Sequence, residues 1–335
     1  MKKLIAIILF LVSARVVSAE SFDTEVPFTN PVWAFDAPDP TWWKAGEEYY
    51  LASTRGSILK SRDFINWKEE KKDFLAPGER QEIRKEWRGI WAPDVVKIGD
   101  NFILYISFWN GPQKTLIASY ISDNPAGPFT NRTVITESEK TKIIDSIDAE
   151  VVTDDETQKT WLFFGSVGKI HRVELASDGR SLAPGAKYEH VAGLSIAGQK
   201  NRDMVFEGAY LYKRGVWWYL FVSSGHYNNH SYAINVGRAR RLTDDFKDRK
   251  GRSMKDGFAE RILSSRPTER FYGPGHNGEI FTTKSGRTYM PYHCHDAKKE
   301  GAPSHRLLLL QEILWDDDDW PYFATGKPTK NGVLR

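Results

Sequence analysis

The sequence predicts an all-β protein, a five-bladed β-propeller. A strand-like segment recurs five times, and no helical pattern of 10–15 residues separates the copies. Each segment opens with an aromatic residue and reaches a small hydroxyl or thiol residue at its sixth position. The segments are residues 49–54, 102–107, 161–166, 218–223 and 289–294. Their first residues lie 53, 59, 57 and 71 positions apart, which suits propeller blades of about 40–50 residues with added loops.

Turn signals lie next to the segments and favour antiparallel hairpins over β-α-β units. They are Lys44-Ala45-Gly46, Gly99-Asp100-Asn101, Asp178-Gly179, Lys213-Arg214-Gly215 and Ser285-Gly286. Aromatic residues make up 13% of the chain, and they favour pleated, half-buried surfaces. A β-sandwich with accidental internal similarity is the alternative fold.

The N-terminus resembles a secretory signal peptide. Lys2 and Lys3 precede an apolar run over residues 4–12, and Val17-Ser18-Ala19 fits a cleavage site for residues 1–19. Val12-Ser13-Ala14 is a second candidate site, and an uncleaved anchor is the alternative. The run is too short to span a bilayer comfortably. We therefore expect a secreted or periplasmic monomer, with residues 20–335 forming a single five-bladed propeller domain.

The charge balance argues against a nucleic-acid partner. Cleavage after Ala19 removes three of the 47 Lys and Arg residues, and the remaining 44 equal the 44 Asp and Glu. The net charge of +3 therefore belongs to the signal, and no basic footprint remains. Because Cys294 is the only cysteine, an internal disulfide framework is excluded.

Acidic residues precede three of the strand segments at similar distances. Asp39, Asp148 and Glu207 lie 10, 13 and 11 residues before their segments. The innermost strand of every propeller blade lines one channel, so these three carboxylates are expected to meet there. Like charges held close together raise the pKa of at least one of them. A protonated acid beside an ionised base is what glycosidic bond cleavage requires.

Neighbouring acids compete for these roles. Asp36 is the rival of Asp39, since Asp36-Ala37-Pro38 is also a turn sequence. Strand alternation would place Asp148 and Glu150 on one face and Asp145 on the other, and the motif position favours Asp148. We expect Asp94, which precedes the second segment, to tie the second blade to its neighbour by accepting backbone hydrogen bonds.

The chain resembles glycoside hydrolase family 43, and within it the arabinan endo-1,5-α-L-arabinosidases. Five motifs carry the resemblance, which runs from about residue 36 to 322. They are Asp39-Pro40, Ile90-Trp91-Ala92-Pro93-Asp94-Val95, Ser146-Ile147-Asp148, Phe206-Glu207-Gly208 and Gly273-Pro274-Gly275-His276-Asn277. The stretches 232–238 and 315–321 point to the arabinanase branch. Ala149 and Ala209 depart from the prolines usual at these positions.

The resemblance implies an inverting hydrolase of arabinan, with Asp39 as general base, Glu207 as general acid and Asp148 as the carboxylate that tunes the acid. It also implies a channel position for His276, which would bind substrate or hold a cation, such as Ca²⁺, through water. We expect Trp91 and Trp109 to form the floor of a sugar subsite, and Arg238 to contact substrate or the acids. The alternatives are an exo-acting arabinofuranosidase, a β-xylosidase and a non-catalytic sugar-binding propeller.

Overall fold

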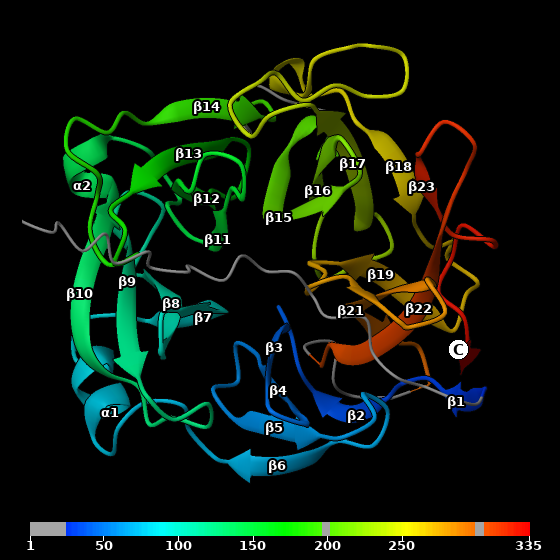
Figure 1. Cartoon of the computed structure of the whole chain (residues 1–335), viewed down its shortest axis with the longest axis horizontal. Helices are drawn as coiled ribbons and strands as arrows, with labels where there is room; N and C mark the ends of the chain where they lie inside the picture. The colour runs from blue at the N-terminus through cyan, green and yellow to red at the C-terminus, as the bar shows by residue number, and fades with distance from the viewer. Residues whose placement is uncertain (1–24, 196–201, 299–304) are drawn as a thin grey trace, which may run out of the picture.

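The computed structural model describes residues 25–195, 202–298 and 305–335, and these residues form five antiparallel sheets around a central axis (Figure 1). The predicted five-bladed propeller is confirmed. The first blade contains β3 (Thr41–Ala45), β4 (Glu48–Ala52), β5 (Ile58–Ser61) and β6 (Lys68–Lys71). The second contains β7 (Gly89–Ile98), β8 (Asn101–Trp109), β9 (Thr115–Ser122) and β10 (Thr130–Glu137). The third contains β11 (Glu150–Thr153), β12 (Thr160–Phe164), β13 (Ile170–Leu175) and β14 (Glu189–Ala192).

The last two blades join the C-terminal half of the chain to its N-terminal strands. The fourth contains β15 (Phe206–Arg214), β16 (Trp217–Ser224), β17 (Ala233–Ala239) and β18 (Glu260–Leu263). The fifth has the order β19 (Phe271–Gly275), β21 (Thr288–Asp296), β22 (Leu307–Trp315) and β2 (Trp33–Asp36). Short strands β20 (Phe281–Thr282) and β23 (Pro321–Tyr322) pair with β21 and β22. Because β2 completes the fifth blade, and β1 (Val26–Thr29) pairs with β24 (Asn331–Leu334), strands from both ends of the chain close the ring.

Little of the described chain is helical. The helices are α1 (Glu79–Arg84), α2 (Ser138–Thr141) and the 3-10 turns η1 (Arg202–Met204) and η2 (Met254–Asp256). None of the helices in the described ranges is long and apolar enough to cross a membrane. The predicted signal peptide lies outside the described residues.

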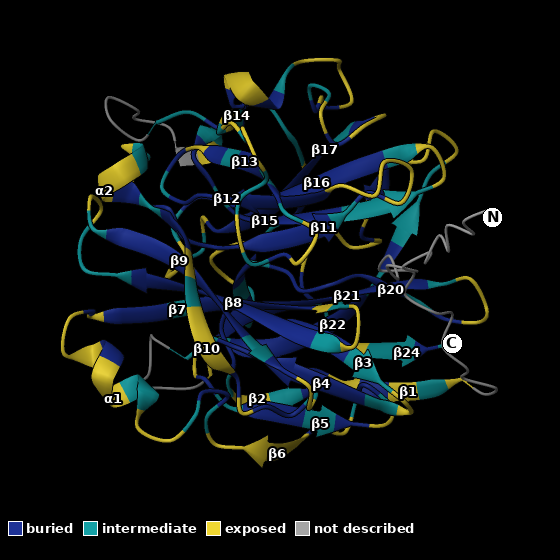
Figure 2. Cartoon of the chain, turned by 60° about the vertical axis from the view of Figure 1, so that its left-hand side comes forward, coloured by how far each residue is buried: buried dark blue, intermediate teal, exposed yellow. Residues whose placement is uncertain are grey.

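The hydrophobic core is divided into five clusters, one between each pair of neighbouring blades. Strand β8 shows why the sequence produces this pattern. Its residues Phe102, Leu104 and Ile106 pack toward the first blade, whereas Ile103 and Tyr105 pack toward the third. Successive side chains of a strand point to opposite faces, so a strand buried on both faces reads as a continuous apolar run. The outer strand β6 is exposed throughout (Figure 2).

Hydrogen bonds from blade to blade complete a ring around the channel. In each blade an inner-strand side chain, or in the fifth blade Glu279 just beyond β19, accepts a backbone N–H from the next blade. The acceptors Thr41, Asp94, Glu150, Tyr210 and Glu279 bind the N–H groups of Val95, Val151, Leu211, Ile280 and Trp42 at 3.3, 2.8, 3.3, 2.8 and 2.6 Å. The predicted structural role of Asp94 is confirmed by its bond to Val151. The ring fixes the inner strands relative to one another, and therefore fixes whatever side chains those strands carry.

Glu279→Gln tests the strength of this ring. Glu279 is buried and accepts both the Trp42 N–H and the Thr41 hydroxyl at 2.7 Å. The amide presents a donor where an acceptor is required, so we expect the free energy of unfolding to fall by about 1–3 kcal/mol. Urea denaturation measures the change, with the exposed Glu156→Gln as the matched control. A variant as stable as the control would contradict the structural role of Glu279.

Candidate active site

In every blade, a residue in the inner strand or within two positions of it has a left-handed backbone at the same end of the channel. These residues are Asp39, Ala92, Asp148, Gly208 and His276, with φ of 55°, 45°, 58°, 59° and 42°. Irregular pairing accompanies three of them, at Trp91/Asp94, Glu207/Tyr210 and Tyr272/Gly275. Such bulges bend a strand and redirect its side chains. The five motifs seen in the sequence are therefore five copies of one kink, which presents side chains to the channel.

In three of the five strand segments, the hydroxyl of the last residue fixes the kink of a neighbouring blade. The hydroxyls of Thr54, Ser107 and Ser223 accept the backbone N–H groups of Ala92, Asp148 and His276 at 2.7, 2.9 and 2.7 Å. The Ser166 hydroxyl instead donates to the Glu207 carboxylate at 2.9 Å. In the fifth blade His293, beside Cys294, accepts the Asp39 N–H at 3.1 Å. A left-handed backbone is costly for residues other than glycine, and these bonds hold it in place.

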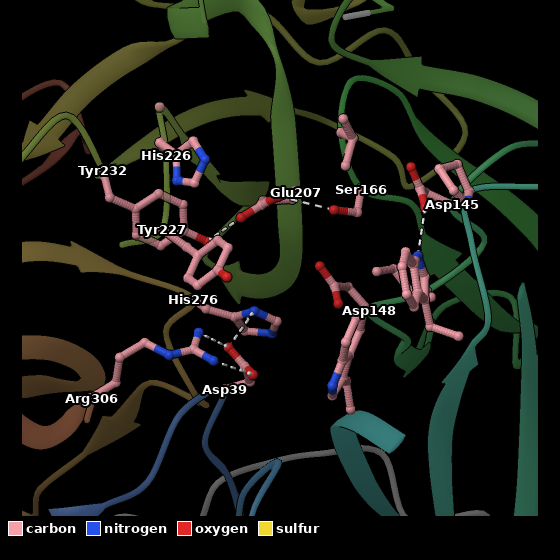
Figure 3. A pocket seen from close by; sticks show the side chains of 16 residues that line it. Asp39, Asp145, Asp148, Ser166, Glu207, His226, Tyr227, Tyr232, His276 and Arg306 are labelled. Carbon is pink, nitrogen blue, oxygen red and sulfur yellow. Dashed lines mark hydrogen bonds and ion pairs between the residues drawn. The ribbon is translucent and has the colours of Figure 1, made fainter. Parts of the chain in front are cut away.

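A pocket of about 470 Å³ opens where the kinks converge. Its walls include the three predicted catalytic acids Asp39, Asp148 and Glu207, together with Trp91, Trp109 and His276. Figure 3 shows the three carboxyl groups pointing into one space from separate blades. The structure thus brings together residues that lie more than fifty positions apart in the sequence.

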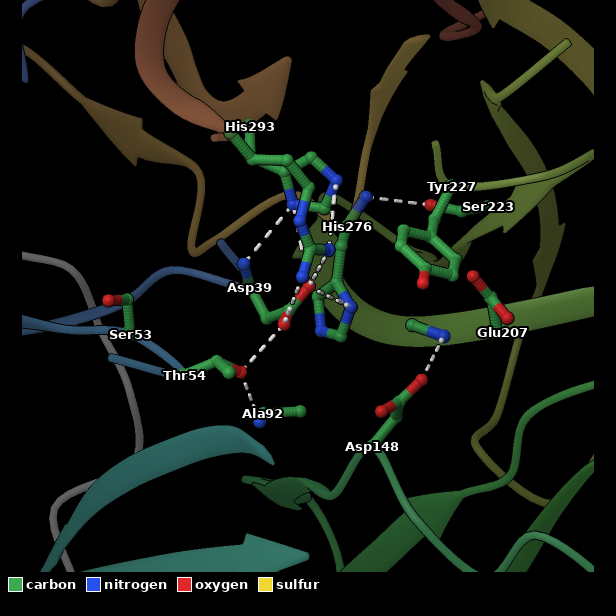
Figure 4. A network of polar contacts seen from close by, with 12 residues as sticks. Asp39, Ser53, Thr54, Ala92, Asp148, Glu207, Ser223, Tyr227, His276 and His293 are labelled. Atoms are coloured by element: carbon green, nitrogen blue, oxygen red, sulfur yellow. Dashed lines mark hydrogen bonds and ion pairs between the residues drawn. The ribbon is translucent and has the colours of Figure 1, made fainter. Parts of the chain in front are cut away.

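Asp39 is held as a buried carboxylate by an arginine from the fifth blade. Arg306 approaches both of its oxygens, at 2.8 and 3.4 Å, and the Thr54 hydroxyl donates to Oδ2 at 2.7 Å (Figure 4). Nδ1 of His276 lies 3.3 Å from Oδ1. Burial acts to raise the pKa of Asp39, but Arg306, His276 and Thr54 together hold it below its usual value. An ionised carboxylate is the form that a general base requires.

Glu207 lies between two hydroxyl groups. The Tyr232 hydroxyl donates to Oε1 at 2.7 Å, and the Ser166 hydroxyl donates to Oε2 at 2.9 Å. Burial raises the pKa of Tyr232 well above its usual value, and the Glu207 charge raises it further, so the phenol keeps its proton. The two hydroxyls fix the direction in which the Glu207 carboxyl group faces the pocket.

Asp148 stands next to Glu207 and shares its electrostatic environment. The Gly208 N–H donates to Asp148 Oδ2 at 3.3 Å. Gly208 is required here, because it has a left-handed backbone and a Cβ would lie 3.0 Å from the His276 ring. Burial raises the pKa of Asp148 well above its usual value, and the charges of Glu207 and Asp39 raise it further. These surroundings therefore favour the protonated form of Asp148 close to the carboxylate of Asp39.

One expectation about the neighbouring acids needs correction. Asp148 and Glu150 do not share one strand face with Asp145 on the other, because Asp148 has a left-handed backbone before β11 begins. As a result Asp145 also lines the pocket, whereas Glu150 belongs to the inter-blade ring. Asp36, the rival of Asp39, accepts the backbone N–H of Arg306 at 2.6 Å and does not belong to the pocket lining.

Arg238 does not line the pocket, contrary to the expectation of a substrate contact. It lies on β17, where its guanidinium is sandwiched between the rings of Trp217 and Trp320, at 4.1 and 4.4 Å from their centroids. It also donates to the backbone carbonyl oxygens of Asp318 and Asp319. Arg238 therefore packs the fourth blade against the turn that follows β22.

Reasoning from the sequence missed Arg306, Tyr232, Tyr227 and the roles of Ser166 and Thr54. The sixth position of the strand segments was a signal for Ser166 and Thr54, because a hydroxyl residue recurs there in four of the five segments. Arg306 gave no such signal, since it belongs to none of the repeated motifs. Its guanidinium lies 5.2 Å from the ring centroid of Tyr227, which forms part of the pocket wall.

The propeller, with the Asp39 carboxylate facing the carboxyl groups of Asp148 and Glu207 across an aromatic pocket, defines a glycosidase. Residues 28–321 match the sequence model of the family "Glycosyl hydrolases family 43", and the chain therefore belongs to this family. The resemblance to its arabinanase branch is confirmed by similar proteins and structures.

The relatives include both endo-acting and exo-acting enzymes. The chain is 26% identical to an extracellular exo-α-(1→5)-L-arabinofuranosidase of Cellvibrio japonicus, over 85% of this chain and 86% of the relative. It is also 26% identical to an extracellular endo-α-(1→5)-L-arabinanase of Bacillus subtilis, over 93% and 96%. A solved structure of a Cellvibrio cellulosa α-L-arabinanase with arabinohexaose superimposes with a TM-score of 0.75 at 25% identity, covering 87% of this chain and 96% of the other.

Proposed function

We propose that this protein hydrolyses α-1,5-linked L-arabinofuranose chains with inversion at the anomeric carbon. The observation that carries this proposal is the position of Asp39 and Glu207 in one pocket, with Asp39 kept ionised by Arg306. The arabinohexaose bound by a structural neighbour and the names of the relatives support the substrate class.

The reaction follows from the positions of the carboxyl groups. Glu207 gives its proton to the glycosidic oxygen as the bond to the anomeric carbon breaks. In the same step a water molecule attacks that carbon from the opposite side and loses its proton to Asp39. Both residues return to their starting states when the protons exchange with solvent. Asp148 touches the Gly208 N–H beside Glu207 and orients the acid.

The pocket offers few ligands for a metal ion. Among the described residues, no group of three or more His, Cys, Asp and Glu side chains is arranged to hold one. At His276 the protein would supply one imidazole, and the guanidinium of Arg306 already faces the adjacent carboxylate of Asp39. Calcium prefers oxygen ligands, so this donor set does not suit a directly bound ion. A cation held through water near His276 stays a prediction, and no catalytic step depends on it.

The relatives also bear on localisation and on the mode of cleavage. We infer an extracellular or periplasmic protein, because the relatives are named extracellular. We propose endo-action first. An exo-acting arabinofuranosidase is the second candidate, since the relative from Cellvibrio japonicus carries that name.

Digestion of linear arabinan tests the function. We expect reducing ends to accumulate and a ladder of arabino-oligosaccharides to form, as chromatography of early time points would show. A single small product from the start would instead identify the exo-acting candidate. Without any release of reducing sugar from arabinan or arabino-oligosaccharides, the proposal would fail and a sugar-binding propeller would be favoured.

A further inference from the structure

A fourth carboxylate, Asp145, is built into the wall of the pocket. Its backbone is fixed on both sides, because its N–H donates to the Pro112 carbonyl at 2.8 Å and its own carbonyl accepts the Ile147 N–H at 2.8 Å. Its φ of 49° is left-handed, and the residue is buried yet lines the cavity. Asp145 is thus held in a defined place, although neither the base nor the acid role falls to it.

The side chain of Asp145 forms one edge of an aromatic wall. Oδ1 accepts the indole N–H of Trp109 at 3.3 Å, and within the described residues Oδ2 has no protein hydrogen-bond partner. Trp109 stacks on Trp91 with their ring centroids 5.2 Å apart, and both rings line the pocket. A flat apolar surface packs against the C–H face of a sugar. A carboxylate at the edge of that surface accepts hydrogen bonds from the sugar hydroxyls.

Asp145 lies on the side of the pocket that belongs to Glu207. Ser166 connects the two residues, since its N–H donates to the Asp145 carbonyl at 3.2 Å and its hydroxyl donates to Glu207 at 2.9 Å. Burial raises the pKa of Asp145 to about 6, with the Glu207 charge adding to the rise. Asp39 and Arg306 lie across the pocket from Asp145 (Figure 3).

We propose that Asp145, with Trp109 and Trp91, binds a hydroxyl of the sugar unit on the leaving-group side of the scissile bond. This inference rests on the proposed arabinan hydrolysis and adds a specificity-determining residue to it. The general acid Glu207 contacts the oxygen of the leaving group. The sugar attached to that oxygen therefore lies next to the part of the pocket wall that runs from Glu207 through Ser166 to Asp145. Asp145 selects substrates that carry a sugar there.

Asp145→Asn tests the proposal with two substrates. An α-1,5-arabino-oligosaccharide places a sugar on the leaving-group side, whereas a nitrophenyl α-L-arabinofuranoside has no hydroxyl-bearing unit there. For the oligosaccharide we expect kcat/KM to fall about tenfold to a hundredfold, mainly through a higher KM, as for a lost hydrogen bond to a charged group. For the aryl substrate we expect a change of less than about twofold, which also reports that the variant is folded.

Asp155→Asn is the matched control, because Asp155 belongs to the same blade but is exposed and lies outside this pocket. It should leave both substrates unaffected. Equal losses of Asp145→Asn on both substrates, or no loss on either, would overturn the assignment. The proposed function fails separately, if the unmodified protein cleaves neither substrate.

Discussion

Replacing Glu207 with Gln is expected to reduce cleavage of arabinan by a factor of about 10²–10⁴, the range that general acid catalysis contributes. The amide cannot give a proton to the glycosidic oxygen, and the poor leaving group of a natural linkage cannot depart without one. An aryl arabinofuranoside with an activated leaving group needs little protonation. The variant should therefore retain most of its activity on such a substrate.

Steady-state rates on both substrates measure this difference. Glu156→Gln is the control, because Glu156 is exposed and pairs with Lys213 outside the pocket. The Gln side chain has nearly the shape of Glu. Its carbonyl oxygen can accept a hydrogen bond from one of the hydroxyls of Tyr232 and Ser166, and its NH2 group can donate to the oxygen of the other, so the pocket should keep its form. Equal loss on both substrates would argue against Glu207 as the proton donor.

Replacing Arg306 with Met is expected to move the acid limb of the pH–rate profile to higher pH. With Arg306 in place, the pKa of Asp39 is below its usual value, and the base stays ionised as the pH falls. Without the guanidinium, the burial that acts to raise this pKa is less opposed. For each unit of rise, the ionised fraction on the acidic side falls about tenfold, so activity at acidic pH should fall by about tenfold or more.

The profile of kcat/KM against pH on an aryl arabinofuranoside measures this shift. The lowered pKa of Asp39 also makes stability depend on pH. The ionised Asp39 stabilises the folded state at pH values above the pKa that Asp39 has in the unfolded chain, and this contribution is lost as the pH falls through the lower pKa of the folded state. Breaking a buried ion pair also costs about 3–5 kcal/mol of stability, so thermal unfolding must be followed in parallel. Arg306→Lys keeps the charge and should keep most of the acid limb. An unchanged acid limb in a folded Arg306→Met variant would refute the role of Arg306 in holding the base.

The sequence was sufficient to predict the ring of five blades and the convergence of Asp39, Asp148 and Glu207. Both follow from a repeat, because a residue at a matched point of each blade faces the same axis. The repeat also includes the hydroxyl residues Thr54 and Ser107. Their role, which is to accept the backbone N–H groups of the left-handed residues Ala92 and Asp148, is seen only in the structure.

Features that depend on local backbone geometry were beyond the sequence. Strand alternation failed at Asp145 and Asp148, because each has a positive φ that breaks the two-residue period. Arg238 was placed in the site because of its motif, yet the rings of Trp217 and Trp320 hold it elsewhere. Arg306 comes from the fifth blade and reaches Asp39 across 267 positions of sequence, a pairing that only the closed ring creates.

The anomeric configuration of the first product tests the central claim most directly, since the claim is single-step hydrolysis between Asp39 and Glu207. Proton NMR can follow an α-1,5-arabino-oligosaccharide during the first minutes of cleavage, before the newly formed reducing ends equilibrate. Attack by water on the face opposite the leaving group predicts that the β-anomer accumulates first. Early appearance of the α-anomer would show retention and would contradict the roles assigned to these two carboxyl groups.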